Sequence, residues 1–323
     1  MYSSWNIRSF LCLRHGALIA LPVCTWRNLD ETVSKIPEMG CFISVSRWHF
    51  GDSIFRLAFC RTIYSAYESH SGIVGLCMGH LIVPAMIEGL PAESFVLGYR
   101  KKSKSSEGAI LLFHGFPADK GNKNSDIAEA LFSKTPYDVF LIHYRGLGDA
   151  KGVFSFSHSI LESVNSAKAL ISRYHYEQVH LIGHSWGGLV AMNVFREIVR
   201  FRGKLLLLSP FNEFPDRSVL SSIIESVIQE IPFLFGHATL DAVLDDLESV
   251  KASCSPRTIA SELQVPAESI TIIQASRDEE VSVASTEAFC KLFPCAPKYF
   301  KLDQDHSFSN REELVRVVLE EFQ

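Results

Sequence analysis

A strand, a turn of small residues and a helix follow one another in residues 178–201, and this stretch constrains the fold more than any other. It opens with an apolar run at 179–182, passes through the turn GHSWGG at 183–188, and continues in a helical pattern from Leu189. Glycines flank Ser185, because a Cβ in so tight a turn would collide with the neighbouring strand or helix. The turn therefore predicts a serine held clear of a sheet.

The pattern Gly-x-Ser-x-Gly between a strand and a helix is typical of a nucleophile elbow. Because a helix begins directly after the serine, the backbone amide of Trp186 is expected to point to the place where an oxyanion would form. The competing interpretation is a plain turn with a buried serine. The flanking strand and helix, which the motif requires, make that interpretation weaker.

Composition excludes several classes of function. The chain has 323 residues, of which 47% are hydrophobic, and this suffices for one large α/β domain or two smaller ones. The net charge is −5 and the sequence has no basic stripe, so we expect no nucleic-acid partner. The eight cysteines form no Cys-x-x-Cys pair and no cluster with zinc spacing, which predicts free thiols in a reducing compartment and no metal.

Residues 1–85 differ from the rest of the chain, because neither helical nor strand periodicity persists there. We interpret them as an N-terminal appendage, poorly ordered or not native, with Met86 as an alternative start and the main domain at 86–323. Apolar segments at 16–24 and 72–90 resemble a weak signal region and a marginal membrane span. The first lacks a small-residue cleavage site and the second contains Glu88, so we expect a cytoplasmic protein and leave membrane association open.

From residue 93 the chain alternates regularly between apolar strands and helices. The first two strands, 93–100 and 109–113, are expected to form a β-hairpin entry. Later strands are predicted at 139–144, 179–182, 204–208, 270–274 and 298–302, and helices at 125–133, 159–174, from 189, at 283–292 and at the C-terminus. Such alternation predicts a mostly parallel sheet with helices on both faces.

Two of these helices carry a candidate capping box, formed by Ser159 with Glu162 and by Ser309 with Glu312. The alternation pauses between 209 and 268, where no strand is evident. Apolar residues recur there at helical spacing, and a second helix is expected at 241–251. The recurring residues are Leu220, Ile223, Ile224, Val227, Ile228 and Ile231. We interpret residues 210–268 as a helical lid, inserted before the strand at 270–274 and lying over the strand ends.

Three strand ends offer Ser185, Asp278 and His306, in the chain order expected when the nucleophile stands on an elbow. A serine hydroxyl needs a histidine to take its proton, and the histidine needs a carboxylate to fix its tautomer. We therefore predict Ser185 as nucleophile, His306 as general base and then acid, and Asp278 as orienter. The predicted oxyanion donors are the backbone amides of Phe116 and Trp186.

Neighbouring residues leave alternatives open. Glu279 or Asp305 would replace Asp278 if that side chain pointed away from the histidine. We expect His114 and His184 to be structural residues that bond backbone groups around the turn.

Residues from about 90 to the end resemble the α/β-hydrolase superfamily, and more closely the monoacylglycerol-lipase and serine-aminopeptidase-like group. The resemblance rests on segments that match in order and spacing: HGFP at 114–117, RGLG at 145–148, GHSWGG at 183–188, the Asp278 turn and DHSF at 305–308. It implies an eight-stranded, mostly parallel sheet with a helical lid. It also implies hydrolysis of an ester, thioester or amide without a cofactor.

The leading hypothesis is a serine hydrolase that cleaves a carboxylic ester of a small-molecule substrate with an apolar acyl group. Ile224, Ile228 and Phe233 of the lid are the predicted substrate contacts. The alternatives are a thioesterase, or a peptidase acting on short peptides or aminoacyl amides. For the peptidase, carboxylates near the site would bind the amine: Glu213, Asp216, Asp241 and Asp245. A non-catalytic ligand-binding module is the second class, although every triad residue type is present. The oligomeric state stays open.

Overall fold

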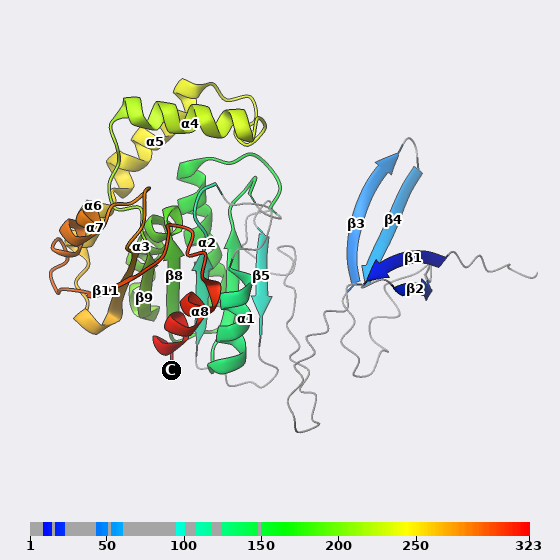
Figure 1. Ribbon diagram of the computed structural model, residues 1–323, viewed down its shortest axis with the longest axis horizontal. Coiled ribbons are helices and arrows are strands. Elements are labelled where there is room, and N and C mark those ends of the chain that lie inside the picture. Colours follow the sequence, from blue (N-terminus) through cyan, green and yellow to red (C-terminus); the bar gives the residue numbers. More distant parts are fainter. Residues whose placement is uncertain are drawn as a thin grey trace, which may run out of the picture. The chain divides into compact units, whose positions relative to one another are not determined.

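The computed structural model describes residues 9–14, 17–22, 43–50, 53–60, 95–100, 108–117, 124–147 and 150–323. The chain divides into two units, Met1–Ala66 and Tyr67–Gln323. The first unit contains two antiparallel hairpins, which the sequence analysis did not predict (Figure 1). One pairs β1 (Ser9–Arg14) with β2 (Ala17–Pro22), and the other pairs β3 (Ile43–Phe50) with β4 (Ser53–Cys60). The segment at 72–90 lies outside the described residues, and the appendage at 1–85 stays a prediction.

The second unit is built around a sheet of seven strands in the order β11-β10-β9-β8-β6-β7-β5 (Figure 1). The strands are β5 (Phe95–Tyr99), β6 (Ala109–Phe113), β7 (Asp138–His143), β8 (Val179–His184), β9 (Arg202–Leu208), β10 (Ile270–Ala275) and β11 (Lys298–Leu302). All neighbours pair in parallel except β5, which runs antiparallel to β7. The mostly parallel sheet is therefore confirmed, whereas the eighth expected strand is not among the described residues.

The predicted β-hairpin between the first two strands is wrong. β5 pairs with β7 in the register Val96 with Ile142, and β7 separates it from β6. Both strands are short and apolar, so their sequence pattern fits either neighbour equally well. β7, which follows β6 along the chain, takes the position between the two strands.

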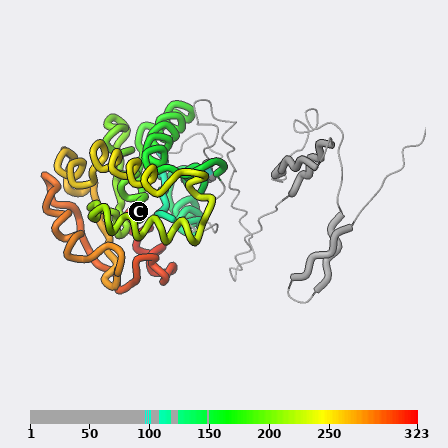
Figure 2. Tube along the Cα trace, turned by 90° about the horizontal axis from the view of Figure 1, so that it is seen from above, coloured from blue at the N-terminus to red at the C-terminus, as the bar shows by residue number. Residues whose placement is uncertain are grey.

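Helices cover both faces of the sheet (Figures 1 and 2). On one face α1 (Ser125–Lys134) contacts α8 (Arg311–Glu320), and on the other α2 (Phe156–Tyr174) contacts α3 (Trp186–Glu197). The remaining helices are the short η3 (Val199–Phe201), α7 (Val283–Cys290) and those of the 209–269 segment. Among the helices that the structure describes, none combines the length and apolarity that crossing a membrane requires.

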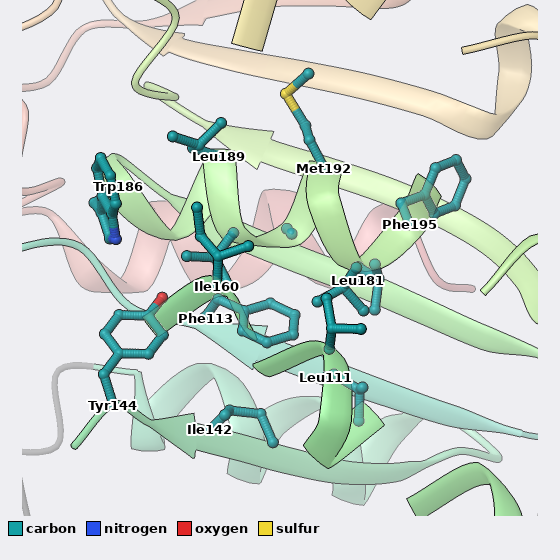
Figure 3. Close-up of a cluster of buried hydrophobic side chains, with 14 of the residues drawn as sticks. Leu111, Phe113, Ile142, Tyr144, Ile160, Leu181, Trp186, Leu189, Met192 and Phe195 are labelled. Carbon is teal, nitrogen blue, oxygen red and sulfur yellow. The ribbon is translucent and has the colours of Figure 1, made fainter. Parts of the chain in front are cut away.

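Central strands are apolar on both sides because each side faces a separate core. Leu111 and Leu181 point into the cluster under α2 and α3, where Figure 3 shows them beside Leu189 and Met192 of α3. Their neighbour Leu112 belongs to the opposite cluster, packed against α1 and α8. This double burial explains why these strands read as continuous apolar runs rather than as alternating ones.

The segment between β9 and β10 folds into three helices, α4 (Arg217–Glu230), α5 (Leu240–Cys254) and α6 (Pro256–Glu262), followed by the short η4 (Ala267–Ser269). α4 and α5 contact each other and lie beyond the carboxyl ends of the parallel strands, above the sheet in Figure 1 and across the second unit in Figure 2. The sequence analysis predicted two of the helices and missed α6. On α4, Leu220, Ile224 and Val227 are buried, whereas Ile223 is 47% exposed, so the buried face is narrower than expected.

Both predicted capping boxes are wrong. Ser155 caps α2 by accepting a hydrogen bond from His158 N, while Ser159 is buried one turn further on. Glu162 pairs instead with Arg145. At α8 the cap is Asn310, whose side chain accepts from the backbone amide of the residue three positions on. In each case a second short polar residue nearby takes the cap, so spacing alone selects the wrong one.

A buried carboxylate anchors the start of β7. Asp138 accepts hydrogen bonds from Tyr176 Oη at 2.6 Å and from Arg100 Nε at 3.3 Å, and its side chain is 1% exposed. The Arg100 guanidinium also stacks over the Tyr174 ring, 3.8 Å from its centroid. Burial raises the pKa of Tyr176, so its hydroxyl stays a proton donor to the carboxylate.

Removing this donor tests how much the anchor contributes. We expect Tyr176→Phe to lower the free energy of unfolding by about 1.5–3 kcal/mol, because a hydrogen bond to a buried charge is lost. Urea-induced unfolding monitored by circular dichroism measures it. The matched control Tyr174→Phe keeps the ring beneath Arg100 and should change stability much less. Equal losses in the two variants would contradict the assigned role of the Tyr176 hydroxyl.

Three histidines of the domain have strongly lowered pKa values. Burial lowers the pKa of His114, His143 and His180 to about 4 in each case. For His180 the nearby charge of Lys204 adds to this effect, while its Nδ1 accepts a hydrogen bond from Lys204 N at 2.9 Å. All three rings are therefore neutral at neutral pH.

The sign of the resulting pH dependence follows from linkage. Between about pH 4 and 6.5 the unfolded chain binds more protons at these rings than the folded one does, so stability falls as pH drops through this window. Each ring contributes a slope of up to about 1.4 kcal/mol per pH unit. We expect His180→Asn to make the free energy of unfolding depend less steeply on pH, by the slope that one histidine contributes. The asparagine amide oxygen can still accept from Lys204 N. Urea titrations at several pH values measure it, and a slope unchanged in the variant would contradict the assignment.

Candidate active site

Ser185 stands at the junction of β8 and α3 with a backbone that few non-glycine residues adopt, φ 53° and ψ −122°. Its amide donates to Leu208 O at 3.0 Å, and its carbonyl accepts from Gly188 N at 2.8 Å and Phe211 N at 2.9 Å. A Cβ on Gly187 would lie 2.3 Å from the carbonyl oxygen of Phe113, so the turn admits only glycine there. Local strain and close backbone approach thus coincide at the serine, as the elbow motif predicts.

His306 and Asp278, predicted as partners, are in contact. His306 Nδ1 donates to Asp278 Oδ2 at 2.8 Å, and the carboxylate side chain is fully buried. Asp278 Oδ1 accepts from the amides of Glu280 at 2.9 Å and Val281 at 2.8 Å. Burial by itself would raise the pKa of Asp278, but the hydrogen bonds from His306 and Val281 N outweigh it and lower the pKa.

The alternative acids lie elsewhere. Asp305 accepts hydrogen bonds from the amide and hydroxyl of Ser309, and so closes the turn before α8. The contact of His306 Nδ1 is with Asp278, so neither Asp305 nor Glu279 is needed to orient the ring.

Two further histidines join the loops around Ser185, in the structural roles predicted for them. His184 Nε2 donates to His306 O at 2.8 Å, which ties the residue before Ser185 to the backbone of the predicted base. His114 Nδ1 bonds Gly115 O at 2.8 Å, and the His114 carbonyl accepts from Tyr144 Oη at 2.9 Å. Their expected backbone contacts are confirmed.

The predicted oxyanion donors flank the serine. Trp186 is the first residue of α3, where helix amides have no intrahelical acceptor. Phe116 belongs to the loop after β6, and a Cβ on its neighbour Gly115 would lie 3.1 Å from Ser185 Cβ. The loop therefore runs directly beside Ser185. The role of the two amides stays a prediction.

An aromatic cluster adjoins this corner, and the sequence analysis missed most of it. The Phe116 ring lies 4.8 Å from both Phe154 and Phe156, and Phe156 lies 4.8 Å from Trp186. Phe235 of the 209–269 segment packs 6.0 Å from Phe156. The alternation of phenylalanine and serine at 154–157 was the available signal.

The three residues predicted as lid contacts differ in exposure. Phe233 is 81% exposed, whereas Phe235 is 4% exposed and belongs to the aromatic cluster. The substrate contact of Phe233 stays a prediction. Ile224 is 2% exposed and packed in the core, and Ile228 packs against that core from its edge. Two residues apart in a turn, Phe233 and Phe235 face opposite environments, which no periodicity reveals.

A buried chain of polar side chains leads away from Asp278 and was also missed. Gln274 Nε2 donates to Asp278 Oδ2 at 3.2 Å, and Gln274 Oε1 accepts from Thr286 Oγ1 at 2.7 Å. Thr286 Oγ1 in turn accepts from Asn212 Nδ2 at 3.0 Å. The three side chains are almost fully buried. A lone glutamine in the apolar strand β10 was the signal in the sequence.

No group of three or more histidine, cysteine or acidic side chains in the described part of the chain could hold a metal ion. The arrangement offers instead a strained serine after β8 and a histidine–carboxylate pair after β11 and β10. The family model described as alpha/beta hydrolase fold matches residues 108–219. The chain has the α/β-hydrolase fold.

Solved structures with this fold superpose on most of the domain. A lipase-esterase related protein from Clostridium acetobutylicum ATCC 824 has a TM-score of 0.54 at 17% identity, covering 72% of this chain and all of the other. An esterase from Exiguobacterium antarcticum has a TM-score of 0.53 at 15% identity, covering 70% and 94% of the two chains. The enol-lactonase from Burkholderia xenovorans LB400 has a TM-score of 0.52 at 13% identity, covering 71% and 95%.

A curated relative with sequence similarity is the 2-hydroxy-6-oxononadienedioate/2-hydroxy-6-oxononatrienedioate hydrolase of Comamonas testosteroni. The two sequences are 31% identical over 104 residues, which is 32% of this chain and 36% of the relative. The chain thus matches about a third of that protein's length. The narrower resemblance to the monoacylglycerol-lipase and serine-aminopeptidase-like group stays a prediction.

The polar chain behind Asp278 can be tested with Thr286→Val, which replaces the hydroxyl by a methyl group of similar size. We expect the free energy of unfolding to fall by about 1–3 kcal/mol, because Asn212 and Gln274 lose a buried partner. Thr286→Ser keeps the hydroxyl and should recover most of the loss that the missing hydrogen bonds cause. Urea unfolding measures both variants. A serine variant as unstable as the valine variant would assign the effect to packing instead.

Proposed function

We propose that this α/β-hydrolase-fold protein is a serine hydrolase that cleaves carboxylic esters with an apolar acyl group. The observation that carries the proposal is the 2.8 Å contact between His306 Nδ1 and the buried Asp278 carboxylate, at the strand ends where Ser185 holds its strained backbone. A histidine oriented in this way keeps its proton on Nδ1 and leaves Nε2 available as a base.

The proposed reaction has the following steps. Ser185 Oγ attacks the ester carbonyl carbon, and its proton passes to His306 Nε2. The carbonyl oxygen becomes an oxyanion that accepts hydrogen bonds from the amides of Phe116 and Trp186. When the tetrahedral intermediate collapses, the C–O bond breaks and Nε2–H protonates the leaving alcohol. Water then hydrolyses the acyl-enzyme through the same base.

The aromatic cluster supports the apolar acyl preference. Phe116 and Trp186, the two predicted oxyanion residues, carry side chains that belong to this cluster, together with Phe154, Phe156 and Phe235. An acyl chain whose carbonyl sat at these amides would run alongside aromatic side chains. α4 and α5 lie beyond the strand ends, which suits a lid over such a chain.

The peptidase alternative receives less support, because three of the four carboxylates it would use are paired with arginines. Arg217 contacts Asp245 at 3.0 Å and Asp241 at 3.7 Å, and Arg257 contacts Glu213 at 3.4 Å. A substrate amine would have to displace these guanidinium groups. A thioester would use the same steps as an ester.

Activity-based labelling tests the proposal directly. We expect a fluorophosphonate probe to label the wild type and not Ser185→Ala, because only an activated serine attacks phosphorus at a useful rate. With p-nitrophenyl esters of rising chain length, the variant should lose at least about 10³-fold in kcat/KM. Ser222→Ala, which removes an exposed serine hydroxyl, is the control and should behave as the wild type. A folded wild type that neither labels nor hydrolyses any ester would favour the binding-module alternative.

A further inference from the structure

Glu280 contacts Nε2 of His306, the ring nitrogen that transfers the proton in the proposed reaction. Its Oε2 lies 3.3 Å from His306 Nε2, the ring nitrogen opposite the one that Asp278 holds. The Glu280 side chain is 67% exposed, whereas that of His306 is 10% exposed. The sequence analysis assigned Glu280 no role.

Glu280 is held near the histidine by its own backbone. The Glu280 amide donates to Asp278 Oδ1 at 2.9 Å, so one turn places the backbone of both acidic residues beside the ring. Arg277, the basic residue of the same turn, pairs with the Asp303 carboxylate at 3.0 Å and donates to the Asp303 carbonyl. The Glu280 charge therefore faces the reacting side of His306 rather than this arginine.

In the proposed mechanism the leaving group passes close to the Glu280 carboxylate. In the proposed mechanism Nε2 first accepts the Ser185 proton and then donates it to the leaving oxygen, so the leaving oxygen must approach Nε2 closely. A carboxylate at 3.3 Å from the same atom lies beside the group attached to that oxygen. A negative charge there attracts a cationic leaving group and repels an anionic one.

We propose that Glu280 is a specificity-determining residue that selects acyl substrates whose leaving group carries a positive charge. The proposal rests on the proposed ester hydrolysis and names the substrate class of that same site. Bond making and breaking are unchanged: the Oγ–C bond forms, the C–O bond breaks, and the proton on Nε2 goes to the leaving alcohol. Glu280 takes no proton in these steps; it moves aside from Nε2 as the leaving group arrives.

Three esters of one acyl group provide the test: a choline ester, its uncharged carbon isostere the neohexyl ester, and an isethionyl ester with an anionic sulfonate. For the wild type we expect kcat/KM to fall in that order. In Glu280→Gln the choline-to-neohexyl ratio should drop about 3–10-fold, as expected for one partly screened charge at close range. Raising the salt concentration tenfold should lower the wild-type ratio in the same direction.

Glu279→Gln is the matched control, because it removes the adjacent charge but not the one at Nε2; it should leave the ratio near the wild-type value. The ratio is measured within each variant, so a change in the general activity of His306 cancels. A wild type that labels with fluorophosphonate and hydrolyses esters, but whose ratio is unchanged in Glu280→Gln, overturns the proposal and leaves the proposed function intact. A wild type that neither labels nor hydrolyses any ester overturns both.

Discussion

The strained backbone of Ser185 depends on a closed circuit of hydrogen bonds. Its carbonyl accepts from Phe211 N, and the next residue, Asn212, begins the buried side-chain path through Thr286 and Gln274 to Asp278. From Asp278 the path continues to the His306 ring, and from the His306 carbonyl to His184, which precedes the serine. An unfavourable φ persists where several neighbouring contacts hold the residue in place. These hydrogen bonds hold Ser185, with its φ of 53°, through its own carbonyl and through the preceding residue His184.

The circuit also explains polar residues that would otherwise weaken the core. Gln274 and Thr286 lie fully buried beside apolar strands, where an unpaired amide or hydroxyl is unfavourable. Each is acceptable because each has a partner on both sides. A fully paired network of this kind rigidifies its members, so the same bonds that stabilise the interior also hold Asp278 against His306. Stability and orientation of the proposed catalytic groups are therefore one property of this domain.

The sequence revealed what depends on local chemistry. The elbow, the apolar strands and the acid and histidine turns follow from short patterns, and the contact between Asp278 and His306 was predicted because parallel strands end at one edge. The sequence did not reveal which strands pair, or which residue of a turn faces the interior. β5 pairs with β7 although its pattern also fits β6, and Phe235 rather than Phe233 faces the interior because a turn has no fixed period. The partner of Gln274 lies 12 residues away on α7, and that of Thr286 is 74 residues away.

The two carboxylates around His306 differ in environment, and the difference separates their roles. Asp278 is fully buried and has its oxygens committed to backbone and side-chain donors, so it can neither move nor exchange partners at low cost. Glu280 is mostly exposed and meets only the second ring nitrogen. An imidazole that donated to both would carry two protons and could not take one from Ser185. Because water competes for the exposed carboxylate, Glu280 can leave Nε2 while Asp278 stays in place. The same residue chemistry thus yields a fixed carboxylate on one side of the ring and a movable one on the other.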